Sequence, residues 1–236
     1  MLGVPLDYHS SPVSVFIKIC GLANAADLAA VAALKPDALG FVLWPKSPRA
    51  VRPEQIAEWT RDLPPGLLKI GVFVDPDADA IRRAVEIARL DVVQWHGFPK
   101  LGKSYTTFFQ ALEKTLSGVS KVYPPAAAPE AIRVWTVVRL DREPAPAFVD
   151  AVVLDSYSPA TPGGTGQTLD WTAARAFVAA STTKVLLAGG LRPENVAEAI
   201  RVVQPWGVDV SSGVEAQPGK KNLDAVKRFI ELCRAN

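Results

Sequence analysis

The chain has 236 residues, of which 49% are apolar and 21% are charged, and its formal net charge is +2. This composition is typical of a globular protein with a large core, and a near-zero charge without a long basic block argues against nucleic-acid binding. There is no run of about 18 apolar residues, and the first residues lack the basic start and apolar stretch of a signal peptide. We therefore expect a cytoplasmic protein with no membrane or nucleic-acid partner.

In chain order, short β-branched runs alternate with longer Ala-rich segments that have helical periodicity. The first helical segment has Asn24 as its expected N-cap, the second has Pro53 in its first turn, and the last has Asn222 as its N-cap. We expect strands at 13–20, 37–43, 67–74, 91–96, 133–140, 151–155, 184–190 and 207–213. We expect helices at 24–35, 53–63, 77–90, 106–116, 169–180, 192–203 and 222–235.

The connection between the fifth and sixth strands is short. It comprises residues 141–150 and contains two prolines, so we expect the helix at this place to be shortened or missing.

Eight strands, nearly all followed by a helix, predict a parallel sheet and, at this length, an α/β fold of the (β/α)₈ TIM-barrel type. The alternative is a doubly wound sheet, whose glycine fingerprint would follow the first strand. Here the glycine-rich ends follow the last three strands instead. We expect an N-terminal extension at 1–12 and a single barrel domain at 13–236.

In such a barrel, the active site lies where the strands end. The stretches "AGGLRPENV" and "VDVSSGVE" place small residues at the ends of the last two strands, where backbone N–H groups can approach an anion. A tight turn alone would also explain these glycines. We expect a small phosphorylated substrate to be held there by Gly189, Gly190, Ser211, Ser212 and Gly213.

Three further candidates for substrate binding follow other strands. Gly164 lies in a glycine run that is not a P-loop and fits the hinge of an active-site loop or a plain surface turn. Arg49, in "WPKSPR", could grip a carboxylate through two hydrogen bonds, although a solvated basic loop is the alternative. His96 ends the fourth strand as a general base or a structural residue. No second histidine is near it in sequence, so we expect no metal site.

Cys20 and Asp155 end the first and sixth strands, and they form a candidate acid/base pair. A thiolate can abstract a proton from carbon, and an aspartic acid with a raised pKa can donate one. The alternative is that Cys20 is a buried apolar filler. The only other cysteine is Cys233, and the pair matches no zinc or iron–sulfur spacing. A disulfide and two free thiols both fit the sequence, and free thiols in a reducing compartment are the simpler interpretation.

Together, these motifs make the chain similar to the phosphoribosylanthranilate isomerase family, barrel enzymes of tryptophan biosynthesis that catalyse an Amadori rearrangement. The matching stretches occur in the family's order and are "KICG", "GFVLWPKSPR", "IGVFVD", "VQWHG", "VLDS", "GGTG" with "LDW", "AGGLRPENV" and "VDVSSGVEAQPGKKN".

The resemblance implies that Cys20 is the general base that removes the C2′ proton of the sugar. It implies that Asp155 is the general acid that protonates the furanose ring oxygen, and that Arg49 binds the anthranilate carboxylate. It implies a 5′-phosphate site at the last two strand ends and a reaction without a cofactor.

The chain departs from the family at Trp95, where leucine is usual, and at Asn222, where aspartate is usual, and it scarcely matches over 98–150. Two other functions are alternatives for this sequence. A related sugar-phosphate isomerase of histidine biosynthesis, or a dual-substrate enzyme, would have aspartate in place of Cys20. A catalytically silent phosphate-binding barrel would have no need of Cys20, Asp155 and Arg49. The sequence fits a monomer or a homodimer.

Strand alternation gives one more expectation. Lys18 lies on the same side of its strand as Cys20, and Asp209 lies on the same side of its strand as Ser211. Because the first and last strands of a closed barrel are neighbours, we expect a buried Lys18–Asp209 ion pair beneath the site. We assign Asp209 to substrate binding as well.

Overall fold

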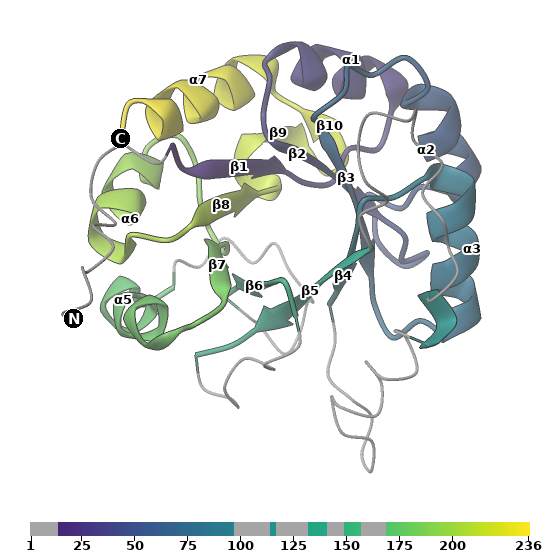
Figure 1. Cartoon of the computed structure of the whole chain (residues 1–236). Coiled ribbons are helices and arrows are strands. Elements are labelled where there is room, and N and C mark those ends of the chain that lie inside the picture. The colour runs from purple at the N-terminus through teal and green to yellow at the C-terminus, as the bar shows by residue number, and fades with distance from the viewer. Residues whose placement is uncertain (1–13, 97–113, 117–131, 141–148, 157–168) are drawn as a thin grey trace, which may run out of the picture.

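The computed structural model describes residues 14–96, 114–116, 132–140, 149–156 and 169–236. Its parallel strands form a closed barrel in chain order, in which the last strand pairs with the first (Figure 1). The strands are β1 (Phe16–Ile19), β2 (Ala38–Val42), β3 (Leu68–Phe73), β4 (Val92–Trp95), β5 (Arg133–Val138), β6 (Ala151–Leu154), β7 (Lys184–Leu187) and β8 (Gly207–Val210).

The described helices surround this barrel (Figure 1). They are α1 (Ala25–Ala33), α2 (Pro53–Trp59), α3 (Ala78–Ala88), α5 (Trp171–Ala180), α6 (Val196–Val203) and α7 (Leu223–Arg234). After β8 the chain forms a short 3₁₀ turn, η1 (Ser212–Val214), and an antiparallel hairpin of β9 (Glu215–Gln217) and β10 (Lys220–Lys221). The predicted single-domain α/β barrel is confirmed, and its closure excludes the doubly wound alternative.

The N-caps expected at Asn24 and Asn222 and the start expected at Pro53 are confirmed, whereas the helices expected from residues 169 and 192 begin later, at Trp171 and Val196. The Asn24 side chain accepts a hydrogen bond from the Asp27 N–H at 2.8 Å, and Asn222 accepts one from the Ala225 N–H at 3.1 Å. Pro53 begins α2. Of the helix expected at 106–116, residues 114–116 are described and helical. The rest of that helix, residues 141–148 of the short fifth connection, and the extension at 1–12 lie outside the described residues.

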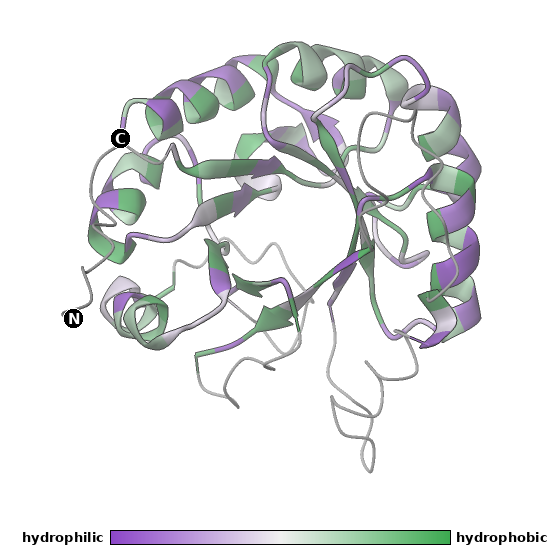
Figure 2. Ribbon diagram, in the orientation of Figure 1, coloured by the Kyte–Doolittle hydropathy of each residue, from purple (hydrophilic) through white to green (hydrophobic). Residues whose placement is uncertain are grey.

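The core has two layers because side chains alternate along each strand. In β6, Ala151 and Val153 belong to a smaller apolar cluster inside the barrel, whereas Val152 and Leu154 pack in the larger cluster between strands and helices. Figure 2 shows the result: the strands are mostly hydrophobic, and the surrounding helices carry hydrophilic and hydrophobic residues side by side.

Aromatic side chains fill the amino-terminal end of the barrel interior. The Phe16 ring stacks on Trp206 at 4.5 Å and meets Trp135 edge-on at 5.9 Å, while the Lys184 ammonium lies 4.8 Å from the centre of the Trp206 ring. Phe16 and Lys184 begin β1 and β7, and Trp206 directly precedes β8. The opposite end, where the strands finish, is left for a pocket.

Candidate active site

A pocket that opens to solvent lies at the carboxyl-terminal ends of the strands. All but one of the site residues predicted from the sequence line it, namely Cys20, Arg49, His96, Asp155, Gly189, Gly190, Asp209, Ser211, Ser212 and Gly213. The remaining one, Gly164, lies outside the described residues.

Cys20 lies directly after β1 and is held by its backbone, since its N–H donates to the Val210 carbonyl of β8 at 2.8 Å. Its thiol occupies space that β2 leaves open at Gly40. A Cβ atom at Gly40 would lie 2.8 Å from Cys20 Sγ and 3.1 Å from Lys18 Cε. The thiol and the Lys18 side chain therefore share one recess in the barrel wall.

The predicted ion pair between Lys18 and Asp209 is confirmed. Lys18 Nζ lies 2.8 Å from Asp209 Oδ2, and the Lys18 side chain is fully buried. Burial by itself would lower the pKa of Lys18, but the nearby Asp209 and Cys20 outweigh it and raise that pKa. Burial also raises the pKa of Asp209. In this pair Lys18 is a charged ammonium, because a neutral amine would leave the buried Asp209 carboxylate without a counter-charge.

Two opposing influences act on the pKa of the Cys20 thiol. Burial raises the pKa of Cys20, and the positive charge of Lys18 opposes that rise. Cys20 is 8% exposed, so solvent and ligands reach it only through the pocket. A thiolate formed here would therefore have Lys18 as its nearest counter-ion.

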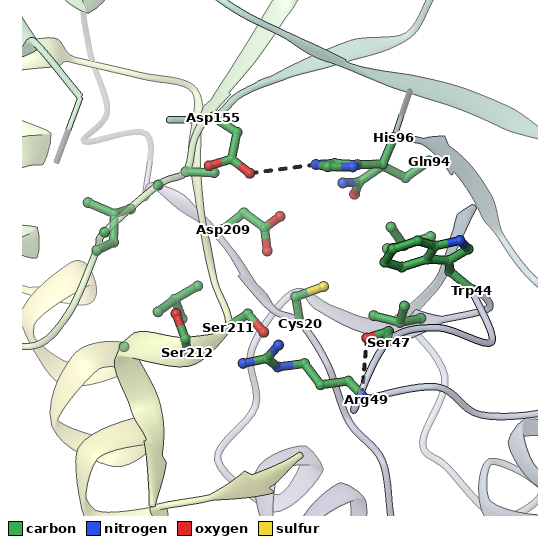
Figure 3. Close-up of a pocket in the computed structure, with 18 of the residues that line it drawn as sticks. Cys20, Trp44, Ser47, Arg49, Gln94, His96, Asp155, Asp209, Ser211 and Ser212 are labelled. Atoms are coloured by element: carbon green, nitrogen blue, oxygen red, sulfur yellow. Dashed lines mark hydrogen bonds and ion pairs between the residues drawn. The ribbon is translucent and has the colours of Figure 1, made fainter. Parts of the chain in front are cut away.

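Asp155 and His96 face each other across one side of the pocket (Figure 3). His96 Nε2 lies 3.8 Å from Asp155 Oδ2, which is too long for a hydrogen bond but close enough for an ion pair when the imidazole is protonated. Both side chains are partly exposed to the pocket. The arrangement brings Asp155, from β6, into the same pocket as Cys20, from β1.

Arg49 grips a carboxylate of the protein itself. Its Nε and Nη2 donate to the two oxygens of Glu215 at 2.8 and 2.6 Å. Lys221 Nζ donates to the same carboxylate at 3.0 Å. Burial alone would raise the pKa of Glu215, but the hydrogen bond from Arg49 and the charge of Lys221 hold it below its usual value. The predicted contact of Arg49 with a substrate carboxylate remains a prediction.

The two small-residue turns pack tightly against neighbouring backbone. Gly189 and Gly190 have φ values of +78° and +66°, which favour glycine. A Cβ at Gly189 would collide with Ser156, and one at Gly213 with the Leu191 carbonyl oxygen. Asn195 helps to hold the turn, since its side-chain amide donates to the Gly190 carbonyl at 3.0 Å.

Sequence reasoning missed several residues of the site. Gln94 lines the pocket and is 3% exposed, and a polar residue inside the apolar run "VVQW" could have signalled it. Glu215 and Lys221 lie in the stretch "VEAQPGKK", but no local pattern pairs them with Arg49. Their link to Arg49 appears only in the tertiary structure.

Other expectations concern metals, disulfides and membranes. Cys20 and Cys233 are both buried free thiols. The described residues contain no group of three or more His, Cys, Asp or Glu side chains that could hold a metal ion. In the same part of the chain, every helix is too short or too polar to cross a bilayer.

Comparison with known proteins adds a family to this geometry. A family model described as N-(5'phosphoribosyl)anthranilate (PRA) isomerase matches residues 17–232. A Pelobacter propionicus protein named N-(5'-phosphoribosyl)anthranilate isomerase is 39% identical over 219 residues, covering 92% of this chain and 95% of that protein. A protein of the same name from a Geobacter species is 37% identical over 217 residues, covering 91% and 95%.

Solved structures agree with this likeness. The phosphoribosyl anthranilate isomerase of Thermotoga maritima superposes with a TM-score of 0.75 at 31% identity, covering 94% of this chain and all (100%) of that one. A phosphoribosyl anthranilate isomerase in complex with reduced 1-(o-carboxyphenylamino)-1-deoxyribulose 5-phosphate gives a TM-score of 0.72 at 31% identity, with coverage of 94% and 100%.

Proposed function

This chain belongs to the N-(5'-phosphoribosyl)anthranilate isomerase family, and we propose that Cys20 and Asp155 are the base and the acid of its reaction. The enzyme converts N-(5'-phosphoribosyl)anthranilate to 1-(2-carboxyphenylamino)-1-deoxyribulose 5-phosphate in tryptophan biosynthesis. The observation that supports the residue roles is the meeting of both side chains in one pocket from different strands (Figure 3).

The reaction begins with ring opening. Asp155 donates a proton to the furanose ring oxygen as the bond from that oxygen to C1′ breaks, and the anthranilate nitrogen forms a double bond to C1′. Cys20, as a thiolate, then removes the proton from C2′, and the electron pair moves between C1′ and C2′ to give an enolamine. Protonation at C1′ and loss of the hydroxyl proton at C2′ yield the ketone. Electrons move only within the substrate, so proton transfers suffice and no cofactor is needed.

Lys18 supports the base in this scheme. A thiolate in a buried place is costly unless a positive charge lies close by. Lys18 raises the fraction of thiolate because its charge opposes the effect of burial on the pKa of Cys20. Asp209 in turn holds Lys18 in place at 2.8 Å.

The remaining pocket residues would bind the ends of the substrate. We assign the carboxylate of the anthranilate ring to Arg49 and the 5′-phosphate to Gly189, Gly190, Ser211, Ser212 and Gly213. Asp209 Oδ1 is buried and, among the described residues, accepts no hydrogen bond, so it can receive a sugar hydroxyl. His96 lies beside Asp155 and completes this wall of the pocket. The roles of Gly164, a cytoplasmic location and a monomeric or homodimeric state remain predictions.

The test follows loss of the substrate's anthranilate fluorescence on addition of purified protein. We expect turnover by the native protein, loss of most of kcat in Cys20→Ala and Asp155→Asn, and an increased KM in Arg49→Ala. Cys233→Ala is the matched control for loss of a buried thiol and should keep its activity. Near-native turnover by Cys20→Ala or Asp155→Asn would contradict the assigned roles, and binding without turnover by the native protein would indicate a silent phosphate-binding barrel.

A further inference from the structure

Glu215 and Lys221 are buried charged residues that lie behind the wall of the pocket. Their side chains are 4% and 0% exposed, and neither lines the pocket. Glu215 reaches the pocket through Arg49, which does line it. The guanidinium is therefore the most direct route by which Glu215 can act on a bound ligand.

The hydrogen bonds leave a defined part of that guanidinium available. Glu215 occupies the side formed by Nε and Nη2. Within the described part of the chain, Nη1 makes no hydrogen bond, so the outer edge formed by Nη1 and Nη2 can still grip a second carboxylate with two parallel bonds. Figure 3 shows the guanidinium extended beneath Cys20 and beside Ser211.

Neighbouring backbone fixes the same orientation. The Arg49 side chain crosses Gly21, where an added Cβ would lie 2.7 Å from Arg49 Cδ and 2.7 Å from Ser211 Oγ. A side chain at Gly21 would therefore collide with the Arg49 side chain along its present path. The bidentate pair and this close crossing together hold the arginine in one place.

Lys221 holds the Glu215 carboxylate in place and determines the net charge of the three-residue cluster. Its ammonium donates to Glu215 and, at 3.1 Å, to the Ser211 carbonyl, while its backbone N–H donates to Asp27 at 2.7 Å. Burial lowers the pKa of Lys221 and the charge of Glu215 opposes that change. With both cations protonated, Arg49, Lys221 and Glu215 together carry one net positive charge. Without Lys221 the Arg49–Glu215 pair would be neutral and would attract an anion much less.

We propose that Glu215 is a positioning residue that holds the Arg49 guanidinium with its outer edge ready for the substrate's carboxylate, and that Lys221 keeps this cluster positive. The hairpin of β9 and β10, which supplies both residues, is then part of the specificity apparatus for the aromatic end of the substrate. The inference rests on the proposed contact between Arg49 and that carboxylate.

The experiment compares two ligands. One is reduced 1-(o-carboxyphenylamino)-1-deoxyribulose 5-phosphate, and the other is the same compound without its carboxyl group. For each variant, the ratio of their dissociation constants measures how well the carboxylate is recognised. Glu215→Gln adds one positive charge to the cluster, which by itself favours the carboxylate, but it weakens the bidentate hold on the guanidinium. We expect the loss of that hold to prevail and this preference to fall about tenfold, as for loss of a hydrogen bond to a charged group. Binding of the carboxyl-free ligand and kcat should stay near native, while KM rises.

Two other variants make the result decisive. Glu86→Gln breaks an exposed Arg82–Glu86 pair on α3 and should leave both dissociation constants unchanged. Arg49→Ala should abolish the preference altogether. If it does so while Glu215→Gln keeps the native preference, the positioning role is overturned. If Arg49→Ala keeps the preference, the proposed carboxylate contact fails and the inference fails with it.

Should Glu215→Gln not fold, as judged by circular dichroism, Glu215→Asp replaces it, because its shorter side chain cannot meet both N–H groups.

Discussion

Lys18 is a buried residue that packs in the barrel interior and is proposed to support the thiol of Cys20. Its long side chain fills the recess beside Gly40, and its ammonium lies 2.8 Å from Asp209 Oδ2. Two opposite charges taken out of water gain little net stability, but either one left alone is strongly destabilising. The pair is therefore better understood as support for the thiol of Cys20 than as a source of stability.

This view predicts an asymmetric effect of mutation. Lys18→Met should lower the free energy of unfolding by about 3–5 kcal/mol, because it leaves Asp209 buried without a counter-charge. The double variant Lys18→Met with Asp209→Leu should recover most of that loss while remaining inactive. Urea denaturation monitored by tryptophan fluorescence measures both. Equal losses in the single and double variants would argue against the uncompensated charge as the cause.

The two thiols should differ in their reaction with iodoacetamide. Burial raises the pKa of Cys20 above its ordinary 9.0, so its labelling should be slow at neutral pH and still climbing above pH 9. Burial raises the pKa of Cys233 to about 12, and that residue is 1% exposed, so Cys20→Ala should take up almost no label. A labelling rate that does not change with pH would contradict the assignment.

Among the elements, the turns after β7 and β8 are built as one unit. Residue 213 in the second turn has no room for a side chain because the Leu191 carbonyl of the first turn fills that space. Asn195 braces the first turn from the start of α6, where its side chain accepts from the Arg192 N–H at 2.9 Å. The proposed phosphate site is thus formed before any ligand arrives, which reduces the entropy lost on binding.

Gly213→Ala should disturb this unit more than its size suggests. The added methyl group must displace the Leu191 backbone, so we expect KM to rise by about tenfold or more and inorganic phosphate to inhibit more weakly. Gly66→Ala is the control: it lies before β3, has φ of +99°, and has no atom within 4 Å of an added Cβ. That change should cost about 1 kcal/mol or more of stability and leave KM unaltered. Equal KM values in both variants would refute the interlocked turns.

The order of elements could be predicted from the sequence because apolar periodicity and crossover spacing act locally. Some helix boundaries could not be predicted in this way. The helix predicted at 53–63 ends at Trp59, since the Thr60 hydroxyl donates back to the Ile56 carbonyl at 2.7 Å and two prolines follow at 64 and 65. The Lys18–Asp209 pair was predictable because closure places β1 beside β8 with those residues in register. The Arg49–Glu215 pair was not, because its partners meet through a loop and a hairpin whose geometry no period encodes.

Across the whole molecule, the two ends of the barrel have different tasks. Phe16, Trp135 and Trp206 close the amino-terminal end with stacked and edge-on rings. The carboxyl-terminal end keeps the pocket with Cys20, Asp155 and Arg49, the ionisable groups proposed to act on the substrate directly. This division is the usual one for such barrels, in which one face serves stability and the other serves function.

The division predicts a change in stability without a change in catalysis. Trp206→Ala should lower the free energy of unfolding by about 3 kcal/mol, because it removes a large ring from the aromatic closure. KM and kcat should stay near native at temperatures where the variant is folded. Calorimetry and a fluorescence assay on the same sample measure both. A raised KM in a fully folded variant would show that the two ends are coupled.

The recess at Gly40 has a consequence for how this barrel can vary. The sulfur of Cys20 and the aliphatic end of Lys18 both lie against the one place in β2 that has no side chain. The position of Cys20, the proposed proton acceptor, is therefore limited by a residue with no functional group of its own. A single methyl group at that place would force Cys20, and with it the Lys18 side chain, to shift, with every ionisable group still present. A change at position 40 would therefore alter where the Cys20 sulfur lies in the pocket without altering any group proposed for the chemistry.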